Sequence, residues 1–303
     1  MSSKLRNELF PVLALLFTAT LWGVIWYPLR LLEEAGVQGL WSTLILYSAA
    51  LVVGGIPAVG RLKEITSQPG LMLRLAITVG WCNFSFIVAI IEGNVVGVLL
   101  LFYLSPLWAT LLGWLLLKER ASNASLAVLF LAMVGAVTML WDTALGYPWP
   151  QTESDWLAIS SGFTFALSNV FIRKAQSISI RAKTVVAWAG VVVIALVWIL
   201  AVQLSVPALS AGSLSGAIAL GIFGIMLMTW AVQYGVTHMP VYRSSVILLF
   251  ELVAGAVSAQ LLTDEVVLLQ EWIGGFIIIF AAYLSARIHL GSGNENNKEH
   301  PAC

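Results

Sequence analysis

The stretch SSVILLFELVAGAVSAQLL, Ser244–Leu262, is the segment from which the fold class follows. Its 19 residues nearly match the about 20 residues that an α-helix needs to cross a bilayer, and one carboxylate, Glu251, stands close to the middle. A charge at the centre of a membrane helix costs roughly 2.5–3.5 kcal/mol on insertion scales, so it is expected to face a cavity or a partner. Two hypotheses for Glu251 stay open: a proton-coupling or substrate-ammonium site, and a structural acid held between helices.

The composition of the whole chain agrees with a membrane protein. Of its 303 residues 60% are hydrophobic and 10% are charged, with a mean hydropathy of +0.94, whereas soluble domains are about 25% charged. Because lipid cannot satisfy an open backbone, the spans must be helices. The sequence therefore predicts an all-α integral membrane protein with about ten transmembrane helices. They are placed near residues 10–30, 37–59, 71–91, 95–117, 123–141, 155–175, 184–205, 213–236, 243–262 and 267–288, the first of them retained rather than cleaved as a signal peptide.

The positions of the basic residues set the orientation. With the N-terminus inside, every Lys and Arg except Arg30 falls at the inner end of a span or in an inner connector, as the positive-inside rule requires. The ten spans then leave both termini cytoplasmic. The formal net charge is zero and no long basic run occurs, so no nucleic-acid partner is expected. The two cysteines form no metal-ligand pattern, and neither a metal nor a cofactor is predicted.

The two halves of the chain share a pattern. SPLWATLLGWLLLKE (Ser105–Glu119) and ELVAGAVSAQLLTDE (Glu251–Glu265) align without a gap at an offset of 146 residues. A repeat of five spans must lie upside down relative to its partner, and inverted repeats are typical of secondary transporters. The alternative, that membrane helices resemble one another by composition alone, stays open. The expected organisation is a first five-helix repeat at 1–141, a connector at 142–154, a second repeat at 155–290 and a disordered polar tail at 291–303.

Three motifs resemble a known family. LSPLWATLLGWLLLKE (Leu104–Glu119), DWLAISSGFTFALSNVFIRKA (Asp155–Ala175) and QEWIGGFIIIFAAYL (Gln270–Leu284) are similar to segments of the ten-helix EamA proteins of the drug/metabolite transporter superfamily. The resemblance implies a membrane carrier that usually exports amino acids, drugs or related metabolites. The family commonly has a Glu-Pro pair in span nine, but here Leu252 follows Glu251, and the proline is kept only as Pro106 in span four. A proline kink is therefore not expected in span nine.

Polar and aromatic side chains recur on single faces of several spans and are expected to line a midplane cavity. The alternative for any one of them is a membrane-interface aromatic or a simple tie between helices. The candidate substrate and coupling residues are Glu251, Trp22, Trp26, Asn83, Tyr103, Ser105, Asn169, Thr229 and Gln233. The candidate structural or gate residues are Pro106, Gly113, Glu119, Gly255 and Glu265. Glu119 is expected to bridge to a neighbouring inner arginine.

The expected function is secondary transport of small organic metabolites such as amino acids, as an exporter that works by alternating access. Efflux of drugs or quaternary cations is the alternative within this class. An intramembrane enzyme is disfavoured because the chain contains neither a P-loop nor an H-E-x-x-H motif, and no catalytic residue is predicted. The expected partners are a small-molecule substrate, the bilayer of the plasma (inner) membrane and a proton or exchanged solute. Nothing in the sequence fixes an oligomeric state.

Overall fold

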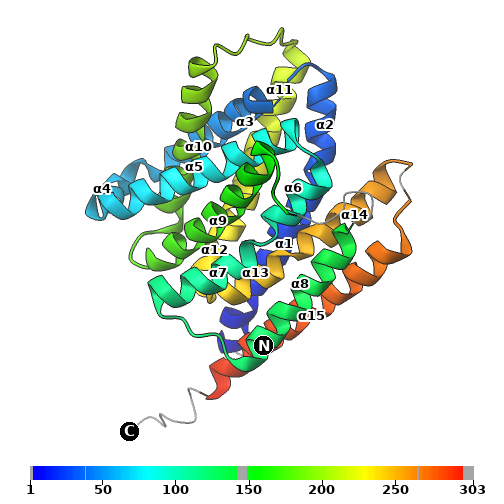
Figure 1. Ribbon diagram of the computed structural model, residues 1–303. Coiled ribbons are helices and arrows are strands. Elements are labelled where there is room, and N and C mark those ends of the chain that lie inside the picture. Colours follow the sequence, from blue (N-terminus) through cyan, green and yellow to red (C-terminus); the bar gives the residue numbers. More distant parts are fainter. Residues whose placement is uncertain (1–2, 38, 142–148, 265, 296–303) are drawn as a thin grey trace.

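The computed structural model describes residues 3–37, 39–141, 149–264 and 266–295, and within these ranges it contains helices and no strand (Figure 1). The first half of the chain consists of α1 (Ser3–Val24), α2 (Trp26–Glu34), α3 (Gly39–Gly55), η1 (Ile56–Arg61), α4 (Leu62–Ser67), α5 (Pro69–Glu92), α6 (Val95–Phe102), α7 (Ser105–Leu112), η2 (Gly113–Leu117) and α8 (Asn123–Leu140). The second consists of α9 (Glu153–Lys174), α10 (Ile180–Ala201), α11 (Ala211–Ala219), η4 (Leu220–Ile225), α12 (Met226–His238), α13 (Val241–Leu248), α14 (Phe250–Leu262) and α15 (Leu269–Glu295). The prediction of an all-α membrane protein is confirmed.

Nine helical segments in the described residues are long and apolar enough to cross a membrane. The tenth predicted span, α9, has 22 residues, enough for about 33 Å of helix, but it is more polar than the others. It packs against α5, α6, α7 and α12, and these neighbours shield its polar residues from lipid. The ten spans expected from the sequence are therefore nine apolar helices and one polar helix in the interior of the bundle.

The ends of the predicted segments differ slightly from the structure. Helix α15 continues to Glu295, five residues into the segment expected to be a disordered tail, and residues 296–303 lie outside the described residues. Residues 142–148 of the predicted connector also lie outside them. The described part of the connector ends in a capping box in which the side chains of Thr152 and Asp155 start α9, as expected at a helix N-terminus.

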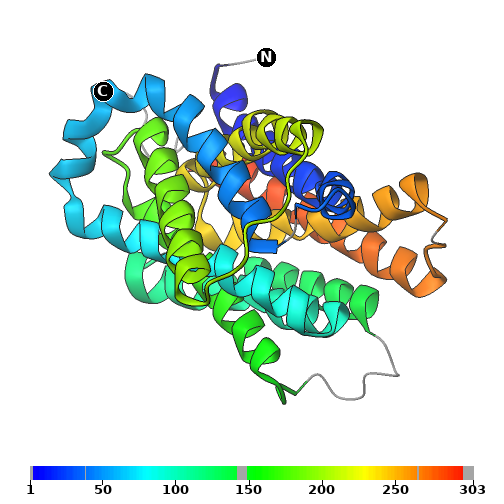
Figure 2. The same ribbon diagram turned by 90° about the horizontal axis from the view of Figure 1, so that it is seen from above.

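The packing partners of the helices are exchanged between the two repeats. Span six (α9) packs against spans three and four, and span one (α1) packs against spans eight and nine. Spans two and seven pack against each other, and so do spans five and ten; α8 and α15 lie side by side at one edge of the bundle in Figure 1, and α3 and α10 lie side by side in Figure 2. Such an exchange is what a two-fold relation between inverted repeats produces.

Spans four and nine are both interrupted at the same register. In span four the break lies at Tyr103 and Leu104, where Pro106 has no N–H to bond the preceding turn. In span nine α13 ends and α14 begins on either side of Leu249, which is equivalent to Tyr103 at the offset of 146. Span nine thus has an interruption without a proline, a break that the sequence argument about the proline kink did not address. Pro106 is the second residue of α7, directly after the interruption of span four.

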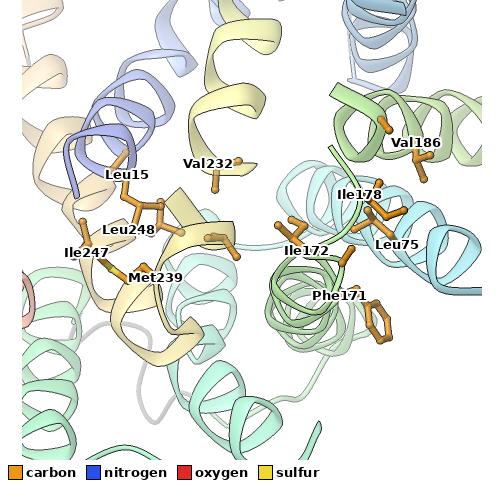
Figure 3. Close-up of a cluster of buried hydrophobic side chains, with 14 of the residues drawn as sticks. Leu15, Leu75, Phe171, Ile172, Ile178, Val186, Val232, Met239, Ile247 and Leu248 are labelled. Atoms are coloured by element: carbon orange, nitrogen blue, oxygen red, sulfur yellow. The ribbon is translucent and has the colours of Figure 1, made fainter. Parts of the chain in front are cut away.

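The largest group of buried apolar side chains lies in the inner half of the bundle. It joins α1, α5, α9, α10, α12 and α13, and Figure 3 shows Leu15, Met239 and Ile247 on one side facing Ile172 and Leu75 on the other. These residues come from the ends of the spans where the basic residues collect. The inner half of the molecule is accordingly filled by apolar packing between the two repeats.

Candidate functional site

The carboxylate of Glu251 lies next to both helix interruptions. Glu251 is the second residue of α14, it is half-buried, and its side chain interacts with that of Tyr103 at the break of span four. Helix α1 approaches this point closely, because a Cβ atom at Gly23 would lie 2.5 Å from the carbonyl oxygen of Glu251. Two of the predicted residues, Glu251 and Tyr103, are thus brought together between the repeats.

A row of aromatic rings leads from Tyr103 to α1. The ring of Phe102 lies 5.2 Å from that of Tyr103, Phe165 lies 5.6 Å from Phe102, and Trp22 meets Phe165 edge to face at 6.0 Å between centroids. Trp22 lies on α1, in the first half of the chain, and Phe165 lies on α9, in the second half. The aromatic row therefore crosses the boundary between the repeats beside Glu251.

Trp26 lies on the outer side of Glu251. Its indole nitrogen donates to the hydroxyl of Ser258 at 2.8 Å, and Ser258 donates to the carbonyl of Gly23 at 3.0 Å. Gly255 lies one turn before Ser258 and offers its carbonyl to the same hydroxyl at 2.8 Å. These contacts tie span one to the part of span nine that contains Gly255 and Ser258.

Asn83 and Thr229 lie away from this site, each in the interior of its own repeat. The hydroxyl of Tyr47 donates to the side-chain oxygen of Asn83 at 2.7 Å, and the indole of Trp188 donates to the hydroxyl of Thr229 at 3.2 Å. Asn83 and Thr229 are equivalent at the offset of 146, so both repeats use the same tie between their second and third spans. The structure does not bring these two predicted residues to Glu251.

The remaining predicted residues lie deeper in the bundle. Ser105 is buried at the first position of α7. Asn169 on α9 and Gln233 on α12 are also buried, and the amide nitrogen of Asn169 and the amide oxygen of Gln233 have no hydrogen-bond partner. Glu265 lies outside the described residues. Each amide therefore has one polar atom without a partner in the interior of the bundle.

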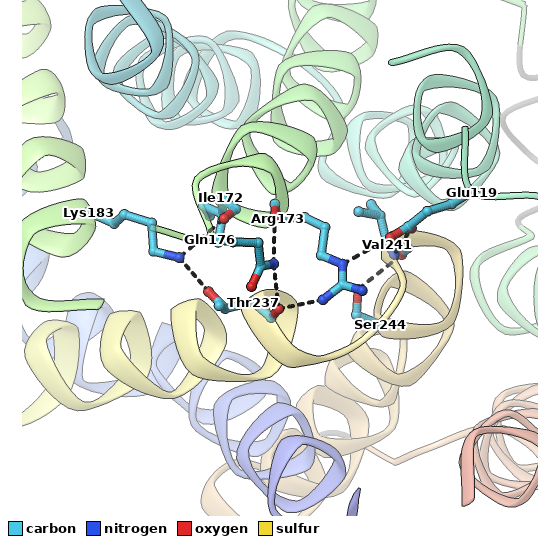
Figure 4. Close-up of polar contacts among 8 residues, drawn as sticks. All are labelled: Glu119, Ile172, Arg173, Gln176, Lys183, Thr237, Val241 and Ser244. Atoms are coloured by element: carbon cyan, nitrogen blue, oxygen red, sulfur yellow. Dashed lines mark hydrogen bonds and ion pairs between the residues drawn. The ribbon is translucent and has the colours of Figure 1, made fainter. Parts of the chain in front are cut away.

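Glu119 forms the ion pair expected at the inner surface. Its carboxylate accepts from the guanidinium of Arg173 at 2.9 Å, and its second oxygen accepts from the backbone N–H of Val241, the first residue of α13, at 3.0 Å (Figure 4). We call Glu119, Arg173, Thr237 and Lys183 the inner latch. Gly113 supports it, because the carbonyl of Gly113 accepts from the backbone N–H of Glu119 at 3.1 Å.

Thr237, near the end of α12, collects the other donors of the inner latch. Its carbonyl accepts from Arg173 and from Gln176, and its hydroxyl accepts from the ammonium of Lys183 at 2.6 Å. Lys183 also donates to the carbonyl of Ile172 at 3.2 Å and is completely buried. Cations are stabilised near helix C-termini. This explains why Arg173 and Lys183 both lie between the C-terminal ends of α9 and α12.

Some residues of the site carry no signal in the sequence that identifies them. Phe102 continues the aromatic row from an otherwise apolar half-helix, and Lys183 resembles any other basic residue at an inner helix end. Tyr47 and Trp188 are the hydrogen-bond donors to Asn83 and Thr229. The sequence gives no sign that these two aromatic residues are the partners. Arg173 was more accessible to prediction, since it aligns with Arg30 and stands at the inner end of span six.

Comparison with known proteins agrees with this architecture. The fold is similar to a solved structure described as "Crystal structure of protein", with a TM-score of 0.69 at 18% identity over 91% of this chain and 96% of that chain. At this identity the likeness shows the fold. No curated protein matches the sequence. Residues 153–287 match the model of the EamA-like transporter family. This match agrees with the resemblance seen in the sequence: residues 153–287 are similar to the EamA-like transporter family, which belongs to the drug/metabolite transporter superfamily.

Proposed function

We propose that this protein is a secondary transporter that exports small organic metabolites such as amino acids across the plasma membrane. The family supports a membrane transporter of the drug/metabolite type. The observation that carries the finer proposal is the position of Glu251, a carboxylate at mid-span beside the interruptions of two inverted helices. Substrate and coupling-ion sites of inverted-repeat transporters lie where such helices break near the midplane.

A difference between the two repeats supports alternating access. Helices α13 and α6 are equivalent residue for residue at the offset of 146, yet all eight residues of α13 are buried and only two of the eight in α6. Two related half-helices would be equally covered in a symmetric molecule. The inner latch and the inner apolar core cover α13, so this conformation is closed on the inner side. In the other conformation α13 would become exposed and α6 would become buried, so that the inner side opens and the outer side closes.

The surroundings of Glu251 favour a substrate that carries an ammonium group. The carboxylate supplies the counter-charge, and the rings of Trp22, Phe165 and Phe102 supply apolar walls and faces that attract cations. The same features fit a quaternary-cation efflux carrier, which is the second candidate. The same carboxylate could exchange a proton for the substrate, which would couple export to a proton gradient.

A reconstitution experiment tests this proposal. The purified protein is placed in proteoliposomes, and fluxes of amino acids and of organic cations are measured with and without a pH gradient. We expect gradient-dependent flux in the wild type, its loss in Glu251→Gln, and normal flux in Glu92→Gln, which alters an exposed acid. Gradient-driven flux that persists unchanged in Glu251→Gln would exclude this carboxylate from coupling. Absence of flux for every solute would contradict the transporter proposal itself.

A further inference from the structure

A cavity lies between α8, α14 and α15, the three helices at the right-hand edge of the bundle in Figure 1. Its volume is about 190 Å³, and every residue that lines it is apolar except Glu271. The side chains of Trp272, Phe276 and Ile279 on its α15 wall are 48%, 69% and 44% exposed. Exposed apolar side chains on a membrane-spanning helix face lipid, so the cavity lies at the boundary between the protein and the bilayer.

The close contact of α15 with α8 explains this space. A Cβ atom at Gly274 would lie 2.6 Å from the carbonyl oxygen of Gly135, so the two backbones touch there. Gln270 donates to two carbonyls at the C-terminal end of α8, at 2.8 and 2.6 Å, and fixes the start of α15 on that helix. Gly275 has no side chain toward α14, where the atom nearest to its Cβ position belongs to Val253 and is 3.6 Å away. Helix α15 is thus held on α8, and room is left beside Gly275.

The cavity runs along the helices. Its lining on α15 extends from Glu271 to Ile279, which is about 12 Å of helix. On α14 it is lined by Val253, Ala256 and Val257, which share one helix face. With both termini inside, α14 ends and α15 begins on the outer side, so the cavity lies at the level of the outer leaflet. Its length is most of the about 15 Å that one leaflet contributes to the hydrocarbon core.

The chemistry of the lining decides what fills the cavity. A buried water molecule needs two to four polar partners, and apolar cavities of this size stay dry. An empty space is unfavourable as well, because the atoms around it lose van der Waals contacts. The molecules that adjoin the cavity in the bilayer are lipid acyl chains, and these enter an apolar space without losing hydration. An acyl chain is therefore the occupant that fits both the lining and the length.

The one charged residue of the lining selects the lipid headgroup. Glu271 stands at the outer end of the cavity, and one of its carboxylate oxygens accepts from the backbone N–H of Leu268 at 2.6 Å. Among the residues that the structure describes, Glu271 forms no ion pair, and the outer base Arg30 is paired with Glu34. An uncompensated carboxylate at the mouth attracts a cation and repels an anionic headgroup. A primary ammonium group has three N–H donors for its free oxygen.

We propose that this cavity binds one acyl chain of an outer-leaflet phospholipid whose primary-amine headgroup pairs with Glu271. The site is separate from the proposed transport site and does not depend on it. The chain packs on Val253 and Ala256, on the side of α14 opposite to Ala254 and Gly255, which meet Gly23 of α1. The bound lipid therefore supports α14 from behind, where the helix has no protein partner beside Gly275.

The test is photo-crosslinking with a defined lipid. The full-length protein is reconstituted in phosphatidylcholine vesicles that contain a small share of phosphatidylethanolamine with a diazirine in the middle of one acyl chain. After illumination, mass spectrometry locates the labelled residues. We expect labelling to concentrate on residues 253–257 and 272–279, above the level on the other lipid-facing helices. Unlabelled phosphatidylethanolamine should compete about fivefold better than phosphatidylcholine, equivalent to about 1 kcal/mol for a partly exposed charge pair, and phosphatidylglycerol should compete least.

Two variants fill the cavity from opposite walls. Gly275→Leu places a side chain in the space beside Val253, and labelling of residues 253–257 and 272–279 should fall to the level of the other lipid-facing helices. Ala256→Leu fills the cavity from α14 and replaces Gly275→Leu if that variant does not fold. Gly55→Leu is the matched control, because its Cβ position has no atom within 4 Å and lies outside the cavity lining. Labelling at the cavity should be unchanged in it.

A third variant tests the headgroup. Glu271→Gln removes the charge but keeps an oxygen for the backbone N–H of Leu268. We expect the chain to be labelled at the same residues, while the fivefold preference for phosphatidylethanolamine over phosphatidylcholine disappears. Asp264→Asn is the control, because Asp264 is an exposed acid on the outer side that does not line the cavity. The preference should persist in Asp264→Asn.

Several results would overturn the proposal. Labelling spread evenly over all lipid-facing helices, or labelling at the cavity that persists in both Gly275→Leu and Ala256→Leu, would show that no chain occupies it. Equal competition by the three headgroups, or a preference that survives Glu271→Gln, would exclude the amine pairing. Loss of a dimer in Gly275→Leu would identify a second copy of the chain as the occupant, and displacement of the lipid by a transported solute would assign the cavity to the transport route. Flux in proteoliposomes tests the transport proposal independently of all these outcomes.

Discussion

Trp22 of α1 and Phe165 of α9 meet edge to face, with their ring centroids 6.0 Å apart. This contact joins the first helix of the chain to the first helix of its second half. The neighbouring ring of Phe102 connects the pair to Tyr103 and so to Glu251.

The first prediction concerns the coupling of this pair. Edge-to-face pairs contribute about 0.5–1.5 kcal/mol beyond burial of their area. A double-mutant cycle with Trp22→Leu and Phe165→Leu, measured on the free energy of unfolding in detergent, should give a coupling of this size. Strictly additive losses in the double variant would show that the two rings act separately.

The second prediction concerns the contact of α1 with α14. Gly23→Ala places a Cβ atom 2.5 Å from the carbonyl of Glu251 and 2.6 Å from the Cβ of Ala254. Backbone must then move, so we expect loss of transport and a lower melting temperature, with a cost of about 1–3 kcal/mol for overpacking. Gly55→Ala is the control, because nothing lies within 4 Å of its new Cβ atom. Equal melting temperatures for the two variants would contradict the close packing.

The third prediction concerns the inner latch. Ser244 on α13 is completely buried and lies beside the guanidinium of Arg173 (Figure 4). We expect a cysteine placed there by Ser244→Cys, after replacement of the two native cysteines, to react slowly with a thiol reagent added from the inner side. Glu119→Gln leaves Arg173 without its anionic partner and should make opening of the inner side more favourable. A change of about 1.4 kcal/mol in the opening equilibrium raises the labelling rate about tenfold.

Glu34→Gln is the control for the latch. It breaks the Arg30–Glu34 pair, whose side chains are 55% and 61% exposed, and exposed pairs contribute little. The labelling rate should therefore stay at the wild-type value in this variant. A rate unaffected by Glu119→Gln would mean that the ion pair does not hold the inner side closed.

The fourth prediction concerns Lys183. Lys183→Met keeps most of the side-chain volume but removes the donor to Ile172 and Thr237. Because the carbonyl of Ile172 then loses a partner inside the protein, we expect destabilisation of about 1–3 kcal/mol, measured as a lower melting temperature in detergent. An unchanged melting temperature would show that the buried cation contributes no stability.

Much of the fold was predictable because membrane physics restricts the possibilities. Length and hydropathy indicate the spans, and the basic residues other than Arg30 indicate the side of each end. The repeat could be found because Ser105–Glu119 and Glu251–Glu265 align without a gap. The bounds of the helices were less predictable. The break at Leu249 contains no proline, so no residue in the sequence indicates it, and it is seen only in the structure, where α13 ends and α14 begins.

The site was predicted in part for a related reason. Periodicity indicates which face of a helix a residue occupies but not which neighbouring helix that face meets. Glu251 and Tyr103 meet because spans four and nine both break there, whereas Asn83 meets Tyr47 of its own repeat. The sequence predicted that Glu119 pairs with an inner arginine, and Arg173 is that partner. Its second contact, with the backbone N–H of Val241, depends on tertiary geometry that no local pattern contains.

The polar character of α9 also has a consequence for how the protein enters the membrane. Its buried polar residues, among them Ser161, Ser168 and Asn169, are kept from lipid by the helices that pack around it. Helix α5, with which α9 makes an extensive interface, precedes it in the chain and is therefore available to cover this polar face when α9 enters the membrane.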